Sequence, residues 1–521
     1  MSQQARIDVA ALDALFAPYD RTDAPGFAVG VALKGIPGYR RGFGMANVEL
    51  PVALSPSIRM RIGSTTKHFC VLAVMLLAEE GKLAIADSPR AYIPELPAWA
   101  DPITIEQLMA HTSGMRDSLD LIFSTAGPGV AADAGFQLDL LAGLDSVNAP
   151  AGTTWNYNNG GYVLLTEIAA RVSGMPFADF LRTRILDPIG MADTLLRPLD
   201  TDLLPNSATQ HLSRSDGGWS RGIFGAWIGG EGGIVSTVND MLAWLRHMSH
   251  PIVGSAETWA QMRTPRMTHG YGLGLNMTKH RGLDTVHHAG GVVGGSSQML
   301  KVLGHELDII LMTNGRSALD LYSLVDAIID CCIQGLPPAP QDAACRLVEG
   351  TFHSARTGQV LSLVGHAGQQ AVVMGGMTLP TTRDADGRMT VAILPTDLRI
   401  LPVETDGVTA LETTEFGEAD HLAPVTVPEC TTAASLIGRY ESRAARLAAD
   451  IRIDEAGAAR IVLSGPLGGT DYLLEPLGPD LWRAVSPTLS PPGGTLEFGA
   501  GGFLFTSGRT VRLAFERSAR A

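Results

Sequence analysis

The chain has 521 residues, of which 45% are hydrophobic and 18% charged, and this composition is typical of folded globular proteins. Its formal net charge of −14 excludes an unspecific phosphate-binding surface, so we expect no nucleic-acid partner. The five cysteines show no CxxC spacing, which argues against a disulfide framework or a zinc site. We expect no metal and no other cofactor.

The N-terminal stretch "MSQQARIDVAALDALFAPYDR" lacks a basic region followed by an apolar one, so we expect no secretory signal. The apolar run Phe69–Ala78 is too short to cross a bilayer, which needs about 20 apolar residues. These features predict a cytoplasmic protein without membrane contact. A secreted protein trimmed of its signal would look the same.

Hydrophobic spacing and turn residues predict the elements of the first two thirds of the chain. A helix is expected over 7–16, then a hairpin of strands 26–33 and 38–50 around a Gly/Pro-rich turn. The segment 61–83 reads as a helix that ends near Gly81. Later we expect two strands within 285–312 and helices at 105–111, 161–173, 177–186, 238–248 and 318–333.

A cluster of turn residues at 334–344 predicts a linker. Beyond it, short alternating runs replace the helical patterns, as in small β-barrels. The stretches "LVEGTFHS" and "LIGRYES" share Gly, an aromatic residue and Ser at an offset of 88 positions, from Gly350 to Gly438. We therefore predict a multidomain α+β protein with a catalytic domain over 1–335 and two antiparallel β-barrels over 345–425 and 430–521. A duplication or chance would explain the offset.

Ser64 and Lys67 form a Ser-x-x-Lys motif ahead of an apolar stripe, and no other lysine of the chain stands in such a motif. Residues i and i+3 of a helix share one face, and a helix start favours negative charge on a serine oxygen. A lysine that burial keeps neutral can take the serine proton. An N-capping serine with a lysine that reaches to water is the alternative reading.

Tyr157 and Asn159 form a Tyr-x-Asn motif in a loop rich in Asn and Gly, directly before a predicted helix. A tyrosine close to cations can act as a phenolate base or return a proton to a leaving group. The neighbouring asparagine can fix the lysine or a substrate carbonyl. A packed tyrosine in an Asn-rich turn is the alternative reading.

The third motif is His288-Ala289-Gly290, at the start of a predicted strand "HHAGGVVGGSSQ". Gly290 and Gly291 would let a substrate backbone lie along the strand edge. The backbone N–H groups of Gly291 and Ser64 are candidates for an oxyanion hole, and His288 for electrostatic tuning of Tyr157. Adjacent strand residues point to opposite faces, so the pair of histidines does not predict a metal site.

Ser-x-x-Lys, Tyr-x-Asn and His-x-Gly, in this order, resemble the penicillin-recognising serine hydrolases, and above all their class C β-lactamase-like branch. Supporting stretches are "ITIEQLMAHTSGMRD", "GGIVSTVNDMLAWL" and "YGLGLNM". The resemblance covers about residues 25 to 330. It implies an antiparallel sheet flanked by helices, with a helical subdomain. His-Ala-Gly replaces the Lys-Thr-Gly of many members, which argues against a typical β-lactamase or DD-carboxypeptidase.

His-x-Gly, the chain length and two C-terminal barrels resemble one narrower group, the D-stereospecific aminopeptidases of bacteria. That resemblance implies a loop of the last barrel in the active site, here about Ala484–Gly494, but this stretch lacks the expected aspartate. Glu231 in "GGEGG" and Asn276 in "GLNM" match the pattern, and Glu231 is a candidate for binding an ammonium group. The candidate substrate-binding residues of the loop are Pro487, Thr488, Leu489, Ser490 and Pro491.

The leading hypothesis is a serine aminopeptidase that releases N-terminal D-amino acids from small peptides, amides or esters through an acyl-enzyme on Ser64. Lys67 and Tyr157 would share the proton transfers, and the sequence leaves open which of them is the resting base. One alternative is an esterase or β-lactamase-like amidase that does not read a free amine. Another is a ligand-binding protein with an inactive site. A homodimer is implied by the resemblance alone.

Overall fold

The computed structural model describes residues 5–133, 135–267, 270–315, 318–337, 347–366, 368–374, 377–384, 386–391, 398–405, 407–415, 417–426, 433–486 and 493–518. The chain folds into two compact units. The first unit comprises Met1–Ile93, Thr104–Ala110 and Tyr162–Ala339. The second comprises Pro94–Ile103, His111–Gly161 and Pro340–Ala521.

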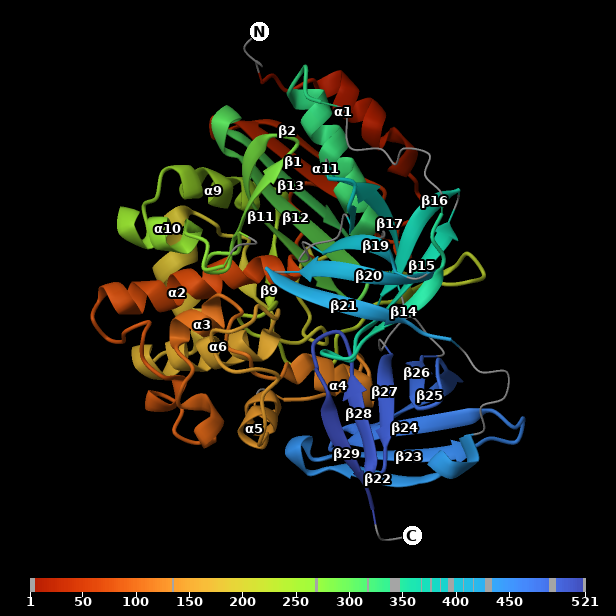
Figure 1. The fold of residues 1–521 in the computed structure, drawn as a ribbon. Coiled ribbons are helices and arrows are strands. Elements are labelled where there is room, and N and C mark those ends of the chain that lie inside the picture. Colours follow the sequence, from red (N-terminus) through yellow and green to blue (C-terminus); the bar gives the residue numbers. More distant parts are fainter. Residues whose placement is uncertain are drawn as a thin grey trace. The chain divides into compact units, whose positions relative to one another are not determined.

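An antiparallel sheet forms the centre of the first unit, with the strand order β10-β11-β12-β13-β1-β2 (Figure 1). Strands from both ends of the unit therefore lie side by side, because β13 pairs with β1. The bounds are Phe27–Leu33 for β1, Ile36–Phe43 for β2, Asn276–His280 for β10, Leu283–Val292 for β11, Gly295–Val302 for β12 and Leu307–Thr313 for β13.

Helices cover both faces of this sheet. Helices α1 (Val9–Phe16) and α11 (Ala318–Cys332) pack on one face, where alternate strand residues such as Phe27 and Ile309 enter a common core with Phe16. Helix α9 (Val238–Ser249) packs on the other face, against β1 and β13. This alternation is the period-2 burial expected of a strand covered on two sides.

The first unit contains further short strands and helices, including the segment that carries Ser64. They are η1 (Ala17–Tyr19), β3 (Met45–Asn47), β4 (Val52–Ala53), β5 (Met60–Arg61), η2 (Gly63–Thr66), α2 (Lys67–Glu79), η3 (Pro89–Ala91), α3 (Ile105–Met109), α6 (Asn159–Ser173), α7 (Phe177–Leu181), η5 (Arg182–Leu186), α8 (Asp187–Ile189), β6 (Leu195–Leu196), β7 (His211–Ser213), β8 (Trp219–Arg221), β9 (Ile234–Ser236), α10 (Ala256–Arg263) and η6 (Leu303–His305). Helix α6 begins in the second unit, which contains its residues up to Gly161.

The predicted helices are present, with two differences of local geometry. Ser64 lies in the 3-10 turn η2, and the α-helix begins only at Lys67. The predicted helix 177–186 continues past α7 as a π-helical turn, η5. The expectation of two strands within 285–312 was wrong, because the region holds β11, β12 and β13. The first break is the turn between Val292 and Gly295, which uses the positive φ of Gly294.

Two closed antiparallel barrels make up most of the second unit, as the alternating patterns predicted. Within the described residues, each barrel has eight strands (Figure 1). The first comprises β14 (Gly350–Ser354), β15 (Val360–His366), β16 (Gln369–Met374), β17 (Met377–Arg383), β18 (Met389–Val391), β19 (Arg399–Thr405), β20 (Val408–Glu415) and β21 (Glu418–Pro424).

The second barrel is preceded by a 3-10 turn, η7 (Ala433–Leu436), and contains another, η8 (Arg443–Ala445). Its strands are β22 (Gly438–Ser442), β23 (Leu447–Ile453), β24 (Ala459–Gly465), β25 (Gly468–Pro476), β26 (Leu481–Val485), β27 (Gly494–Gly499), β28 (Gly502–Thr506) and β29 (Leu513–Arg517).

The short sequence repeat falls on equivalent strands. Gly350 and Gly438 begin the first strand of their barrels, β14 and β22, and each of these strands closes its barrel against the last one. The matched aromatic residues Phe352 and Tyr440 are both buried. The repeat therefore marks the same structural position twice, while its origin by duplication stays a prediction.

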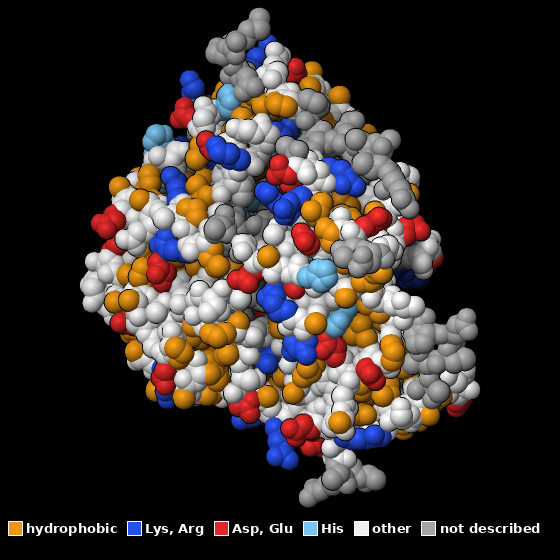
Figure 2. Space-filling model, in the orientation of Figure 1, with side chains coloured by type: hydrophobic (Ala, Val, Ile, Leu, Met, Phe, Trp, Pro, Cys, Tyr) orange, Lys and Arg blue, Asp and Glu red, His pale blue; other side chains and the backbone are white. Residues whose placement is uncertain are grey.

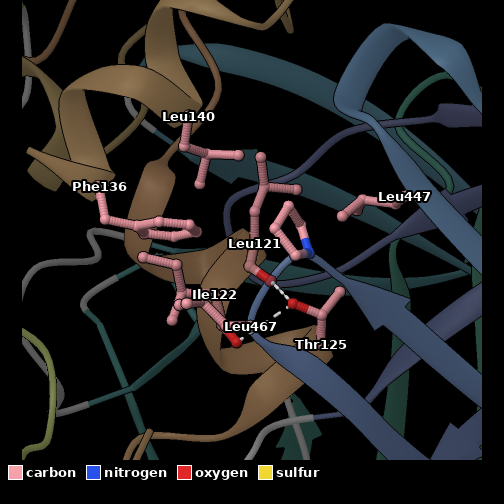
Figure 3. Close-up of a pocket in the computed structure, with 8 residues that line it drawn as sticks. Leu121, Ile122, Thr125, Phe136, Leu140, Leu447 and Leu467 are labelled. Carbon is pink, nitrogen blue, oxygen red and sulfur yellow. Dashed lines mark hydrogen bonds between the residues drawn. The ribbon is translucent and has the colours of Figure 1, made fainter. Parts of the chain in front are cut away.

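Three further helices belong to the second unit: η4 (Ala98–Ala100), α4 (Ser118–Ala126) and α5 (Phe136–Ala142). Figure 3 shows the apolar side chains of Leu121, Ile122 and Phe136 beside Leu447 and Leu467 of the second barrel. In α4, the Thr125 hydroxyl donates to the Leu121 carbonyl at 2.8 Å, which leaves an apolar face towards the barrel. Sequence patterns did not predict α4 and α5.

Acidic and basic side chains are interspersed over the face seen in Figure 2. Across the described residues, no helix is long and apolar enough to cross a membrane. The same residues hold no cluster of three or more His, Cys, Asp or Glu side chains that could bind a metal ion.

A buried ion pair joins two strands of the central sheet. Lys301 on β12 faces Asp308 on β13, and their side chains are bonded and almost fully buried. The Lys301 ammonium also donates to the Ser249 hydroxyl at 2.8 Å, at the end of α9.

We expect Asp308→Asn to lower the free energy of unfolding by about 3–5 kcal/mol, because it leaves the Lys301 charge buried without its counter-ion. Asp284→Asn is the matched control, since the exposed Asp284 side chain on β11 pairs with the exposed Lys279 side chain on β10 at 2.7 Å. That change should cost about 0–1 kcal/mol. Urea unfolding measures both, and equal losses would contradict the prediction.

Candidate active site

The Ser64 hydroxyl and the Lys67 ammonium lie 3.4 Å apart, where η2 passes into α2. Ser64 is partly accessible, whereas Lys67 is completely buried. The Lys67 ammonium donates to the backbone carbonyl of Glu231 at 2.7 Å and lies 5.0 Å from the ring centroid of Tyr162. A buried amine beside an accessible hydroxyl can activate that hydroxyl as a nucleophile.

The loop "GGEGG" fixes the carbonyl that Lys67 contacts. Gly230 N–H donates to the Thr166 hydroxyl of α6 at 2.8 Å, so the loop is attached to the helix that also carries Tyr162. The Glu231 carboxylate accepts the N–H of Gly229 at 3.0 Å and is 2% exposed. Glu231 therefore meets Lys67 through its backbone, while its side chain stabilises its own loop.

Strand β11 lies directly against the turn that carries Ser64. A Cβ atom on Gly290 would stand 1.8 Å from the Ile62 carbonyl oxygen, and one on Gly63 would stand 2.8 Å from the Gly291 nitrogen. Ser297 adds a hydrogen bond of 2.8 Å from its hydroxyl to the Ile62 carbonyl. Gly290 therefore serves close packing of two backbones, in addition to the substrate access proposed from the sequence. A Cβ on Gly291 would meet nothing within 4 Å.

His288 is buried and held by two hydrogen bonds. Its Nδ1–H donates to the Ala289 carbonyl at 2.6 Å, so its Nε2 accepts from the Tyr271 hydroxyl at 3.2 Å. Burial, and then the nearby Lys67 ammonium, lower the pKa of His288 to about 3. The ring is neutral in this state, so any influence of His288 on Tyr157 must act without a full positive charge.

A layer of buried aromatic rings surrounds His288. His68 stacks on Trp244 with ring centroids 5.2 Å apart, and its ring centroid lies 6.4 Å from that of His288. Among the described residues, neither ring nitrogen of His68 has a hydrogen-bond partner. Burial lowers the pKa of His68 well below its ordinary value and that of His287 to about 4.

Tyr157 and Asn159 belong to the second unit, where a separate network orients them. The Asp117 carboxylate accepts the backbone N–H of Asn159 at 2.8 Å and its side-chain N–H at 3.1 Å. The Tyr157 ring packs against His111, with centroids 4.2 Å apart, and under the Arg509 guanidinium at 5.0 Å. The pairing of Tyr-x-Asn with a carboxylate and an arginine is not apparent from the motif alone.

The first unit thus brings Ser64, Lys67, Glu231, His288, Gly290 and Gly291 together around one turn. Asn276, also in this unit, stands on β10 opposite His287 of β11. The candidate loop residues Pro487, Thr488, Leu489, Ser490 and Pro491 lie outside the described residues. Sequence reasoning missed Tyr162 and Tyr271. Tyr162 could have been found if the predicted helix 161–173 had been extended back to Asn159, where α6 begins, because residues three positions apart share a helix face.

The family described as Beta-lactamase matches residues 12–325. This range contains all the candidate site residues named above except those of the barrel loop. The chain belongs to the beta-lactamase family. It is a serine hydrolase of the penicillin-recognising type.

Two relatives named D-aminopeptidase extend the match. The protein from Gluconobacter oxydans is 29% identical over 367 residues, 68% of this chain and 67% of that protein. The protein from Brucella canis is 28% identical over 478 residues, 88% of this chain and 87% of that protein. The latter match reaches beyond the beta-lactamase region into the barrels.

A solved structure supports the fold. The D-amino acid amidase from Ochrobactrum anthropi SV3, complexed with L-phenylalanine amide, superposes with a TM-score of 0.53 at 21% sequence identity. The superposition covers 62% of this chain and 98% of that one. This likeness establishes the shared fold of the catalytic part.

We expect Gly290→Ala to reduce turnover at least about a hundredfold, because its methyl group would displace the turn that carries Ser64, and ångström-scale misplacement costs about 10²-fold. Gly291→Ala is the matched control one residue away, in open space, and should fold with wild-type stability. Steady-state kinetics and thermal unfolding test the pair. Equal activity of Gly290→Ala and the wild type would contradict the packing argument.

The buried histidines predict a pH-dependent stability. The folded-state pKa values of His68, His287 and His288 lie below the ordinary value near 6.5. Below that pH the unfolded chain therefore binds protons that the native state does not bind. Stability is therefore retained above pH 6.5 and lost as the pH falls. At pH 5, His287 and His288 should each cost about 2 kcal/mol.

Urea unfolding at pH 7.5, 6.5 and 5.0 measures this loss in the wild type and in His68→Phe. Phenylalanine keeps the stacking on Trp244 but takes up no proton, so the variant should lose less stability on acidification. An unchanged pH slope in His68→Phe would show that His68 is not one of the responsible groups.

Proposed function

We propose that the chain is a D-aminopeptidase, which releases N-terminal D-amino acids from peptides, amides or esters through an acyl-enzyme on Ser64. The observation that carries the proposal is the pairing of an accessible Ser64 hydroxyl with the completely buried Lys67 side-chain nitrogen. The relatives named D-aminopeptidase supply the substrate class.

In the proposed mechanism, the Ser64 oxygen attacks the carbonyl carbon as its proton passes to Lys67 in its neutral amine form or to Tyr157 as the phenolate. The N–H groups of Ser64 and Gly291 hold the resulting oxyanion, and open space beside Gly291 supports this role. The proton then goes to the leaving amine as the C–N bond breaks. Water then attacks the acyl-enzyme and gives a proton to the same groups, which transfer it to the Ser64 oxygen as the acyl bond breaks.

The proposal assigns Tyr157 and Asn159 to the same reaction as Lys67, as the order of the three motifs and their resemblance imply. Asn159 would then hold Lys67 or the substrate carbonyl. The resting base is the coupled pair of Lys67 and Tyr157, without an assignment to one of them.

The remaining parts of the proposal come from the sequence and its resemblance. They are the division into domains 1–335, 345–425 and 430–521, a cytoplasmic location and a homodimer. The strands of the two barrels fall inside the proposed ranges 345–425 and 430–521. Sedimentation equilibrium of the purified protein tests the homodimer.

A second candidate function is an esterase or amidase that does not read a free amine. Two observations favour it: the stretch Ala484–Gly494 has no charged side chain, and the Glu231 carboxylate is buried and accepts the N–H of Gly229. If Glu231 does not receive the substrate ammonium, acetylation of that amine should matter little.

A hydrolysis panel on the purified protein distinguishes the two functions. It compares the p-nitroanilides of D-Ala and L-Ala, each with a free and with an acetylated amine, and uses Ser64→Ala as the blank. Turnover of free D-Ala alone is the expected result. Turnover that is indifferent to acetylation would replace the aminopeptidase by the esterase or amidase.

Glu231→Gln tests the amine site in the same panel, because glutamine keeps an acceptor for the Gly229 N–H and removes the negative charge. If Glu231 binds the ammonium group, the preference for the free over the acetylated amine should fall at least about tenfold, the scale of one charge-assisted hydrogen bond. An unchanged preference would remove Glu231 from the amine site.

A further inference from the structure

The turn between β28 and β29 of the second barrel is hydrogen-bonded to the first turn of α4. The buried Asp120 carboxylate accepts the hydroxyl of Thr510 at 2.7 Å and also that of Ser507. Both donors belong to the turn 507–512, and Asp120 lies in the first turn of α4. The carboxylate therefore clamps the two sides of the turn.

Asn148 and Arg116 hold the backbone of the same turn. The Asn148 amide donates to the Arg509 carbonyl at 2.7 Å, and its oxygen accepts the N–H of Val511 at 3.0 Å. The Arg116 guanidinium donates to the Val511 carbonyl at 3.1 Å and to the Asn148 side chain at 2.8 Å. These hydrogen bonds fix the backbone at Arg509 and at Val511, and this limits the directions that the Arg509 side chain can take.

The Arg509 side chain contacts both residues of the Tyr-x-Asn motif, one directly and one through a carboxylate. Its guanidinium carbon lies 5.0 Å from the Tyr157 ring centroid. Its Nη1 lies 3.4 Å from the Asp117 oxygen that accepts both N–H groups of Asn159. Asp117 is completely buried, whereas the Arg509 side chain is about one third exposed.

We propose that Arg509 is a positioning residue for hydrolysis: it holds the Tyr157 ring and, through Asp117, the Asn159 side chain in their working orientation. This inference rests on the proposed function, in which Tyr157 transfers protons. A cation at the face of an aromatic ring is attracted to it, and the attraction grows as the phenol oxygen gains negative charge. The second barrel would thus act on the chemistry through one arginine.

Two other rings that the described part of the second unit places near Tyr157, those of His111 and Trp155, do not supply this charge. His111 accepts the N–H of Asn158 at its Nδ1, at 3.1 Å, so its ring is neutral while this bond exists. Trp155, with ring centroids 6.1 Å from Tyr157, carries no charge. The Asp117 carboxylate is negative and is offset by Arg509 itself.

Three variants test the inference. Arg509→Met keeps the length of the side chain and removes its charge, Arg509→Lys keeps the charge, and Arg512→Met removes an arginine of the same turn. Arg512 is a matched control because its guanidinium bonds the Ala355 carbonyl at 2.9 Å and Glu497 at 2.8 Å, away from Tyr157. Thermal unfolding of each variant reports whether the turn stays folded.

The measurements are kcat and KM for D-Ala p-nitroanilide, and the rate of Ser64 acylation by p-nitrophenyl acetate, with Ser64→Ala as the blank. We expect Arg509→Met to lower kcat and the acylation rate about tenfold, with KM changed less than about twofold. Arg509→Lys should keep most of both rates, and Arg512→Met should match the wild type. Equal losses in Arg509→Met and Arg509→Lys, a change in KM alone, or no change would overturn the inference.

The ester separates this inference from the proposed function, because its acylation of Ser64 requires no D-amino acid. If the wild type reacts with the ester and not with the D-anilide, the aminopeptidase proposal fails. The Arg509 and Arg512 variants are then compared by their rates of acylation with the ester. A wild-type protein that the ester does not acylate would overturn both proposals.

Discussion

The turn that carries Ser64 packs backbone to backbone against strand β11, and the candidate active site depends on this approach. A side chain at Gly290 would occupy the place of the Ile62 carbonyl, so the two segments can meet only where the Cβ is missing. Ser297 then fixes the same carbonyl by a hydrogen bond. The central sheet thereby sets the position of the nucleophile, and its strands come from both ends of the first unit.

Around this contact the protein buries polar groups that have defined partners. Lys67 is completely buried yet bonded to a carbonyl and to Ser64, and the Glu231 carboxylate is bonded within its own loop. His288 is neutral and held by Tyr271 and Ala289. A low-dielectric site of this kind strengthens each of these hydrogen bonds and makes the loss of any partner costly.

The second unit contributes differently, because its helices and loops are attached to the last barrel. Asp120, Asn148 and Arg116 bind one barrel turn, and that turn directs Arg509 to Tyr157 and Asp117. The Tyr-x-Asn motif is therefore connected to a segment about 350 positions later in the chain, as the pairing of Asp117 with Arg509 shows. The last barrel therefore contacts Tyr157 and Asp117 through the side chain of Arg509.

The sequence by itself determined the helices with strong periodicity, the two barrels and the three short motifs, because these depend on local spacing. It also determined the pairing of Ser64 with Lys67, since three positions separate them. Only the tertiary structure decided that Ser64 lies in a 3-10 turn, that Gly290 packs on Ile62, and that Lys67 bonds the backbone carbonyl of Glu231. The partners Asp117 and Arg509 likewise lie far apart in the chain, and a sequence pattern carries no signal for contacts that arise when distant segments pack together.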